Sequence, residues 1–339
     1  MPEVNFKRKK PFSAKIAAAG SADAGRHFAS LASTLGIDHE FVEIDHLGEV
    51  KNAADLDLVT EVELLWCHGR FSGEWVVKAA SIFPNLSWIH SDFVGVDALP
   101  LGEFAKRGLL LTNGGDNFAR PMAEWAVLGI LASAKRMTWF VRNSDNAKWD
   151  NSIELRELQG AKVLLLGMGS VNSLVAQMLK GFGAEIVGWS RTLRPQEEDG
   201  IRSITGEAWQ SEITQADYVV VGLPMTKATR GIINQSVLES MKDDVTIVNL
   251  SRGGLIDHDA LVKVLDRKKI RFALLDAYEV EPLPSSDPLW RRENVLVLPH
   301  HSWSSPKVTE NTVQRMRSLL ATWVAGEPIE DAVDYGAGY

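Results

Sequence analysis

The sequence predicts an α/β protein made of two doubly wound parallel-sheet domains. At 339 residues the chain is too long for one domain of ordinary size. Its 45% hydrophobic and 24% charged residues are typical of a globular protein and exclude disorder or a coiled coil as the main state. Short β-rich runs alternate with helical segments along the chain, which is the pattern of βαβ units.

The β-rich runs form two series. The first series predicts a smaller α/β domain and covers residues 15–19, 40–44, 62–67, 86–90 and 109–112. The second series covers residues 161–166, 185–189, 218–221, 246–250, 271–275 and 295–298. Six strands joined by helical connections are typical of a Rossmann sheet, which binds a dinucleotide.

A long helix is predicted between the two series, over residues 120–141. Asn117 is its expected N-cap, and Pro121 stands near its first turn. Because the segment is apolar around most of its circumference, we expect it to be buried, either by the other domain or by a second subunit. Another helix is predicted after Pro306; it could return to the first domain and make that domain discontinuous.

Charge and cysteine content limit the possible partners. A net charge of −8 and a pI near 5.6 argue against a nucleic-acid-binding surface. The single cysteine, Cys67, cannot form an internal disulfide, and no apolar run approaches the ~18 residues that would cross a bilayer. We therefore expect a cytoplasmic protein with no nucleic-acid or membrane partner.

A glycine turn follows the first strand of the second series. Gly167 permits the tight turn, and Gly169 lets the backbone approach a pyrophosphate at the positive end of the next helix, which Ser170 and Val171 open. The third glycine position holds Asn172, which adds volume where little room is expected. Two glycines in such a turn are also common without any ligand, so the turn alone leaves both interpretations open.

The end of the next strand bears on the choice of cofactor. An NAD-binding protein usually places a carboxylate about 20 residues beyond the turn, but this chain has Ser190, Arg191 and Thr192 there. A hydroxyl and a guanidinium suit a 2′-phosphate, with Arg194 as reinforcement. The sequence thus favours NADP(H) over NAD(H), although Arg191 alone could also be an exposed loop cation.

Three polar residues follow strands of the second series: Arg252, Glu281 and His300. Ligands of open α/β sheets bind at the carboxyl ends of strands, so together these residues suggest an anion clamp, a tuning carboxylate and an acid/base. Singly, each also fits a structural role, as an ion-pair partner, a turn residue or a hydrogen-bonded histidine. No metal site is expected, because adjacent His300 and His301 point to opposite faces of a strand.

In several blocks the sequence resembles the D-2-hydroxyacid dehydrogenase family, most closely its glyoxylate/hydroxypyruvate reductase branch. These blocks are residues 163–171, 188–192, 222–226, 248–253, 275–283, 287–290 and 298–300. The resemblance implies a flavodoxin-like substrate-binding domain of residues 1–118, completed by 305–339, and an NAD(P)-binding Rossmann domain of 119–304. It also implies an active site between the domains and a homodimer formed through the helix at 120–141.

The resemblance also implies roles for individual residues. Arg252 would clamp the substrate, His300 would be the acid/base, and Glu281 would orient its ring and favour its protonated form. The amides of Val94 and Gly95 would bind the substrate carboxylate, and Asp276 the nicotinamide amide. Further cofactor contacts would come from Leu223, Pro224, Thr226, Ser251 and Ser302. The family's pattern is broken by Asn172, by the bulky Phe93 and by His301-Ser302-Trp303.

The loop that follows the third strand carries a hypothesis about specificity. We expect His68 or Arg70 to contact the distal end of the substrate, although a structural histidine and a surface arginine are equally consistent with the sequence. The predicted function is NADP(H)-linked interconversion of a small 2-oxo acid and its D-2-hydroxy acid. A weakly catalytic dinucleotide-sensing corepressor and a phosphite dehydrogenase-like enzyme are the alternatives.

Overall fold

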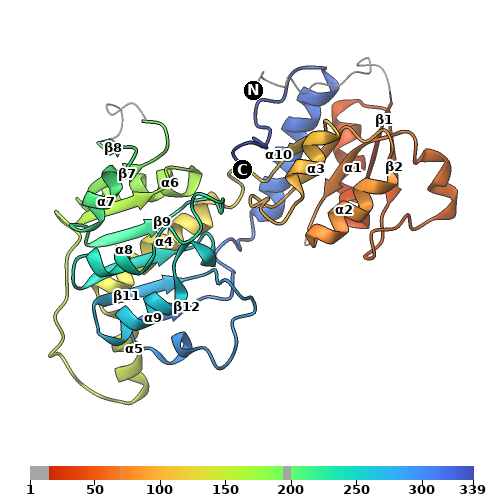
Figure 1. Cartoon of the computed structure of the whole chain (residues 1–339). Helices are drawn as coiled ribbons and strands as arrows, with labels where there is room; N and C mark the ends of the chain where they lie inside the picture. The colour runs from red at the N-terminus through yellow and green to blue at the C-terminus, as the bar shows by residue number, and fades with distance from the viewer. Residues whose placement is uncertain (1–14, 70, 194–199) are drawn as a thin grey trace. The chain divides into compact units, whose positions relative to one another are not determined.

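The computed structural model describes residues 15–69, 71–193 and 200–339. The chain divides into two compact units, Met1–Asn117 with Pro306–Tyr339, and Phe118–Ser305 (Figure 1). The predicted division after residues 118 and 304 lies one residue from each of these boundaries. Two residues of the predicted site region, Arg70 and Arg194, lie outside the described residues.

The first unit contains a five-stranded parallel sheet with the order β2-β1-β3-β4-β5. Its strands are β1 (Ile16–Gly20), β2 (His39–Glu43), β3 (Val62–Cys67), β4 (Trp88–Ser91) and β5 (Leu110–Thr112). All five were predicted, because each is a short apolar run bounded by turn residues.

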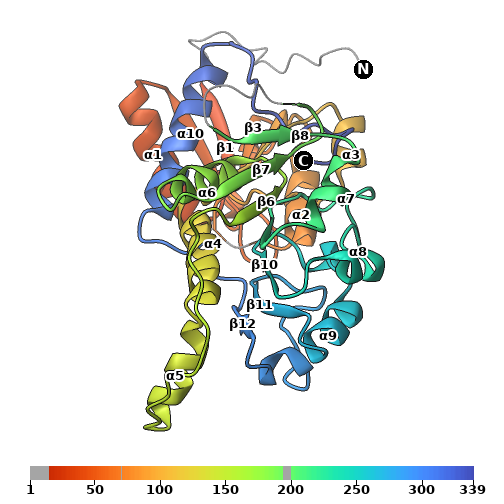
Figure 2. The ribbon, with the colours of Figure 1, turned by 90° about the vertical axis from the view of Figure 1, so that its left-hand side faces the viewer.

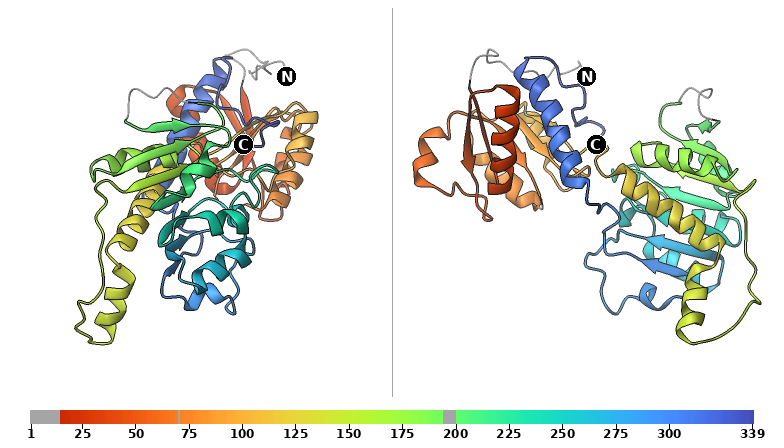
Figure 3. Two further views of the ribbon diagram at one scale, coloured as in Figure 1. Left: turned by 60° about the vertical axis from the view of Figure 1, so that its left-hand side comes forward. Right: turned by 180° about the vertical axis from the view of Figure 1, so that it is seen from behind.

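In the described residues of this unit, four α-helices and one 3-10 helix, η1 (Ala53–Leu58), accompany the sheet. One face is packed by α1 (Ala22–Leu35) and α10 (Val308–Val324), which lie side by side in the right-hand view of Figure 3. The other face is packed by α2 (Gly73–Ile82) and α3 (Leu101–Lys106). The Ser21 and Ser72 side chains accept hydrogen bonds from the backbone N–H groups of Ala24 and Trp75 and so cap the N-termini of α1 and α2.

The second unit contains a seven-stranded parallel sheet with the order β12-β11-β10-β9-β6-β7-β8. Its strands are β6 (Lys162–Leu166), β7 (Glu185–Trp189), β8 (Arg202–Ile204), β9 (Tyr218–Val221), β10 (Val245–Asn249), β11 (Ile270–Leu275) and β12 (Val295–Val297). The predicted α/β fold class, with two parallel sheets, is therefore confirmed. Strand β8 was not predicted, because it has only three residues and opens on an arginine.

Helices cover both faces of this second sheet. One face is packed by α4 (Ala119–Ala134) and α6 (Ser170–Lys180). The other face is covered by α7 (Ala208–Ile213), α8 (Gln235–Ser240) and α9 (His258–Asp266). The 3-10 helices η2 (Gly253–Leu255) and η3 (Pro288–Arg291) contribute Leu255 and Leu289 to the same apolar cluster. No helix in the described parts of the chain is long and apolar enough to cross a membrane.

The prediction of one buried helix over residues 120–141 is wrong. The segment forms two helices, α4 and α5 (Met137–Asp145), separated at Arg136, whose φ of 51° is left-handed. Helix α5 buries no residue and projects from its unit (Figure 2). Asn117 caps neither helix, because its side-chain amide donates to Thr312 Oγ1 at 3.3 Å, within the first unit.

Candidate active site

The glycine turn joins strand β6 to helix α6 in the second unit. Gly167 has a φ of 90°, and a Cβ there would lie 2.6 Å from the carbonyl oxygen of Gly222, so only glycine fits. Gly169 is the N-cap of α6, and it has no side chain of its own to cap the helix. A Cβ on Gly169 would meet no atom within 4 Å. The first-turn N–H groups of α6 therefore have space beside them for a phosphate oxygen, which fits a dinucleotide.

Asn172 occupies the third glycine position without leaving the helix. Its side chain is buried, and Nδ2 donates to the carbonyl oxygen of Gly167 at 2.8 Å. The Asn172 amide thus gives the Gly167 carbonyl oxygen a hydrogen-bond partner and stabilises the conformation of the turn. Asn172 therefore fits at the third glycine position, where its side chain makes a hydrogen bond that a glycine could not make.

The segment after β7 is held mainly through its backbone. Ser190 Oγ donates to the carbonyl oxygen of Thr192 at 2.7 Å, and Thr205 Oγ1 donates to that of Arg191 at 2.7 Å. These bonds fix the main chain of Arg191, whose side chain is exposed. A guanidinium on such a backbone can reach an anionic group beside the turn.

Arg252 follows β10 in a turn shaped by Asn249. Nδ2 of Asn249 donates to the carbonyl oxygen of Arg252 at 2.9 Å, and its Oδ1 accepts from Ser251 Oγ at 3.0 Å. A Cβ on the next residue, Gly253, would lie 2.1 Å from the carbonyl carbon of Tyr278. The backbone on both sides of Arg252 is therefore fixed, which orients its half-buried side chain.

His300 and Glu281 form a direct pair. Nδ1 of His300 lies 2.7 Å from Oε2 of Glu281, and Oε1 of Glu281 accepts from the backbone N–H of Tyr278 at 2.8 Å. His300 has a φ of 51°, an unfavourable conformation for histidine that clusters at functional sites. The indole N–H of Trp303 donates to the His300 carbonyl oxygen at 2.9 Å. With Nδ1 held by the carboxylate, Nε2 remains for proton transfer.

Asp276 anchors the segment that follows His300. It is fully buried and accepts hydrogen bonds from the backbone N–H groups of His301 at 2.7 Å and Ser302 at 3.0 Å, and from the Ser302 hydroxyl. Both Asp276 and Ser302 therefore position the backbone around His300. A contact of either residue with a nicotinamide stays a prediction.

The remaining predicted cofactor residues lie after β9. Leu223 is buried, and the Pro224 carbonyl oxygen accepts from Thr229 Oγ1 at 2.6 Å. The Thr226 hydroxyl lies 3.0 Å from the Thr229 hydroxyl. These bonds close a compact turn at the carboxyl edge of the second sheet.

The predicted substrate loop lies in the first unit, directly after β4. The backbone N–H of Gly114 donates to the Phe93 carbonyl oxygen at 3.1 Å, and Asn113 Nδ2 donates to that of Val94 at 2.9 Å. Val94 and Gly95 are exposed at the tip of this anchored loop. Their amides can therefore meet an anionic group without unfolding the loop.

Asp92, which the sequence pattern did not single out, joins His68 to this loop. Nδ1 of His68 lies 2.7 Å from Oδ2 of Asp92, and the carboxylate is almost fully buried. The signal in the sequence was a carboxylate placed directly after a strand, where all four strand residues are buried and a buried carboxylate requires partners.

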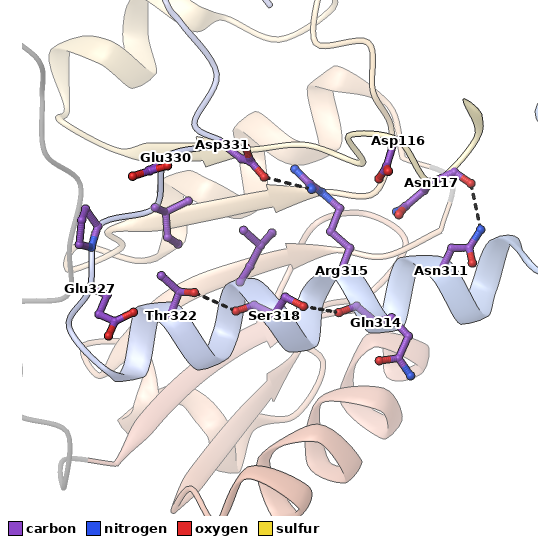
Figure 4. Close-up of a pocket in the computed structure, with 13 residues that line it drawn as sticks. Asp116, Asn117, Asn311, Gln314, Arg315, Ser318, Thr322, Glu327, Glu330 and Asp331 are labelled. Atoms are coloured by element: carbon purple, nitrogen blue, oxygen red, sulfur yellow. Dashed lines mark hydrogen bonds and ion pairs between the residues drawn. The ribbon is translucent and has the colours of Figure 1, made fainter. Parts of the chain in front are cut away.

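A pocket of about 720 Å³ in the first unit contains none of the predicted site residues (Figure 4). Arg315 of α10 donates to the Asn113 carbonyl oxygen at 2.6 Å and lies 3.4 Å from Asp331. Asn311 donates to the Asn117 carbonyl oxygen at 3.2 Å. These contacts attach α10 to residues 113–117. Among the described residues, no group of three or more His, Cys, Asp or Glu side chains is placed to hold a metal ion.

The fold and these residues define a nicotinamide-dinucleotide-dependent oxidoreductase. A sequence model of the D-isomer specific 2-hydroxyacid dehydrogenase NAD binding domain matches residues 127–302. The chain belongs to the D-isomer specific 2-hydroxyacid dehydrogenase family.

Relatives in this family carry several activities. A glyoxylate reductase of Thermococcus gammatolerans is 30% identical over 82% of this chain and 85% of its own length. A D-3-phosphoglycerate dehydrogenase of Archaeoglobus fulgidus is 28% identical over 76% of this chain, and the match covers 49% of that longer protein.

Solved structures show the same fold. A D-isomer specific 2-hydroxyacid dehydrogenase of Xanthobacter autotrophicus, in complex with NADPH and MES, has a TM-score of 0.80 and 27% identity over 96% of this chain and 100% of its own. An NADPH-dependent glyoxylate/hydroxypyruvate reductase of Sinorhizobium meliloti, with NADP and sulfate, has a TM-score of 0.77 and 22% identity over 96% and 100%.

Proposed function

We propose that the protein is an NADP(H)-preferring reductase that interconverts a small 2-oxo acid, of the glyoxylate or hydroxypyruvate kind, and its D-2-hydroxy acid. The observation that carries the proposal is the 2.7 Å contact between His300 Nδ1 and Glu281 Oε2 at the carboxyl edge of the dinucleotide-binding sheet. A carboxylate that orients an imidazole in this way is the arrangement of a general acid/base.

The roles of the residues follow from their chemistry. A bound nicotinamide supplies or accepts the hydride at carbon 2. His300, protonated on Nε2, donates a proton to the 2-oxo oxygen, and in the reverse direction its neutral ring accepts that proton. Arg252 provides a fixed positive charge for the substrate carboxylate and for the charge that develops on the oxygen.

The amides of Val94 and Gly95 bind the substrate carboxylate in this proposal. Support comes from the anchoring of their loop by Asn113 and Gly114, which leaves both residues exposed. Backbone N–H groups in a preformed loop bind an anion without a large cost in conformational entropy.

The preference for NADP(H) rests on Ser190 and Arg191. Two side chains at the end of β7 offer a hydroxyl and a guanidinium where NAD-binding proteins place a carboxylate. The related Xanthobacter autotrophicus dehydrogenase was solved with NADPH, which supports the same choice for this chain.

A cytoplasmic homodimer formed through the helical segment near residues 120–141 is also part of the proposal. The apolar side chains exposed on and after this segment are Leu128, Met137, Phe140, Val141, Trp149 and Leu155. So many large apolar side chains exposed on one segment of the chain are typical of a subunit interface.

The test is a kinetic screen of the purified protein with NADPH and NADH in parallel. The substrates are glyoxylate, hydroxypyruvate, pyruvate, oxaloacetate, a phosphorylated 2-oxo acid and, in the oxidative direction, phosphite. NADPH-dependent turnover of glyoxylate or hydroxypyruvate is the expected result. Tight NADPH binding without turnover would favour a dinucleotide-sensing protein, and turnover of phosphite alone would favour phosphite oxidation.

A further inference from the structure

A second histidine–carboxylate pair lies in the first unit, at the carboxyl ends of β3 and β4. It consists of His68 and Asp92, whose Nδ1 and Oδ2 atoms are 2.7 Å apart. This pair shares no residue with the pair of His300 and Glu281 in the second unit. Asp92 has no role in the mechanism proposed above.

The carboxylate of Asp92 is held in place by two hydrogen-bond donors. Its Oδ1 accepts from the indole N–H of Trp66 at 2.9 Å, and its Oδ2 accepts from the backbone N–H of Gly69 at 3.1 Å. Nε2 of the buried His90 lies 3.8 Å from Oδ1. The buried carboxylate, fixed in this way, faces the ring of His68.

The contact between the two residues fixes the ring of His68. Nδ1 is buried, and its N–H is poorly aligned with the oxygen, so the contact is mainly electrostatic. Two lone pairs would repel each other at this distance, which places a proton on Nδ1. Because Nδ1 faces Asp92, Nε2 is the ring nitrogen that remains for a ligand.

Packing holds the ring in place from two sides. The His68 ring centroid lies 5.1 Å from that of Trp66 and 5.0 Å from that of His27. Only 10% of the His68 side chain is exposed. The ring therefore has little rotational freedom and is preorganised to bind a small group.

The pair adjoins the proposed substrate loop through the chain itself. Asp92 immediately precedes Phe93, Val94 and Gly95, and Asp92 also binds the backbone of Gly69 beside His68. The buried carboxylate of Asp92 thus connects the proposed substrate loop with the imidazole of His68 at the end of the neighbouring strand β3.

We propose that His68 binds the hydroxyl group on carbon 3 of the substrate, with Asp92 as its positioning residue, so that the enzyme selects 3-hydroxy-2-oxo acids over 2-oxo acids with a methyl group there. This inference rests on the proposed function. A neutral Nε2 accepts a hydrogen bond from a hydroxyl, and a protonated Nε2 donates one to it. A hydroxyl therefore suits both states of the ring, whereas a methyl group leaves Nε2 without a partner.

The test compares hydroxypyruvate, pyruvate, glyoxylate and oxaloacetate as substrates of the full-length protein and of its His68→Leu, His68→Gln and Asp92→Asn variants. We expect His68→Leu to lower kcat/KM for hydroxypyruvate roughly 10- to 100-fold, mainly through KM, so that the ratio of kcat/KM for hydroxypyruvate to that for pyruvate falls by at least that factor. His68→Gln should restore part of the loss, because an amide can also donate and accept. Asp92→Asn should lower the ratio of kcat/KM for hydroxypyruvate to that for pyruvate, because the charge that faces Nδ1 of His68 is lost.

The matched control is His46→Leu, which removes an exposed histidine of the same unit and should change none of these ratios. Thermal unfolding and NADPH affinity show whether each variant is folded. Equal losses for pyruvate and hydroxypyruvate in His68→Leu would overturn the inference. A loss confined to oxaloacetate would also overturn it, since that result would make His68 a carboxylate-binding group.

A binding measurement separates this inference from the proposed function. Calorimetry with the NADP⁺ complex reports the affinity for hydroxypyruvate and pyruvate even if no 2-oxo acid turns over. Absence of turnover refutes the proposed function, and a hydroxypyruvate affinity that His68→Leu leaves unchanged refutes the role of His68.

Discussion

Asn172 and Gly222 occupy one shared volume beside the phosphate-binding turn. A Cβ on Gly222 would lie 2.6 Å from Nδ2 of Asn172, the atom that donates to the Gly167 carbonyl oxygen at 2.8 Å. Helix α6 approaches the sheet closely at residue 172, so a larger side chain there requires a smaller one opposite it. Gly222, just past the end of β9, provides that space.

This relationship predicts strong coupling between the two positions. Gly222→Ala alone should destabilise the second unit by about 1–3 kcal/mol, because the added methyl group overpacks a buried contact. In the Asn172→Gly background the same Gly222→Ala change should cost much less, since the amide that crowds the added methyl group is then absent. Urea unfolding of the four proteins in this cycle measures the coupling, and strictly additive effects would contradict the shared volume.

Features that depend on a short stretch of sequence could be predicted, whereas features that depend on contacts between residues distant in sequence could not. The two sheets, the glycine turn and the strand-end positions of Arg252, Glu281 and His300 could be predicted because each depends on a short local pattern. The fit of Asn172 could not, because its partner Gly222 is distant in sequence. The break at Arg136 also escaped prediction, since Lys135, Arg136 and Thr138 interrupt the apolar pattern there without a glycine or a proline to mark the end of a helix.

His300 is expected to be essential for turnover and dispensable for cofactor binding. Asparagine tolerates the left-handed backbone of residue 300, so His300→Asn should keep the fold while lowering kcat by roughly 10²–10⁴-fold. NADPH affinity, measured by fluorescence, should change less than about threefold. His301→Asn is the control, because His301 contacts Asp276 through its backbone N–H. A larger loss in His301→Asn would show that the acid/base is the neighbouring residue.

Arg191 is expected to distinguish the two nicotinamide cofactors. Its side chain is exposed on a backbone held by Ser190 and Thr205, so replacement by alanine should leave the fold intact. A charge-assisted bond to a 2′-phosphate is worth about 1.5–3 kcal/mol, which predicts roughly 10- to 100-fold weaker NADPH binding. NADH binding should hardly change. Equal weakening of both cofactors would argue against a 2′-phosphate contact.

His90 is expected to make the first unit sensitive to acid. Burial lowers the pKa of His90 to about 4 from the usual 6.5, and its Nδ1 lies 2.7 Å from the Thr112 hydroxyl. Because the unfolded chain takes up this proton first, stability is complete above about pH 6.5 and falls as the pH decreases toward 4. The loss is at most roughly 3 kcal/mol.

Denaturant unfolding followed by tryptophan fluorescence at several pH values measures this effect. His90→Gln removes the titrating group, so its free energy of unfolding should depend less steeply on pH between 4 and 6.5 than that of the wild type. Some slope should remain, because burial also lowers the pKa of His27. Identical slopes in the two proteins would show that His90 does not titrate in this range.

Trp149 provides a sharp test of the proposed homodimer. Its side chain is 98% exposed, and Phe140 on α5 is 41% exposed, so both leave large apolar surfaces in water within a single subunit. Aromatic residues of this kind dominate the binding energy of interfaces, and the loss of one typically costs 2 kcal/mol or more. Trp149→Glu and Phe140→Glu should each raise the dimer dissociation constant at least about 30-fold, as measured by light scattering during size-exclusion chromatography.

Val280→Glu is the control for the dimer prediction. It alters a side chain that is 63% exposed but lies outside the proposed interface segment, so it should leave the dimer unchanged. A wild-type protein that is monomeric at micromolar concentration would refute the interface.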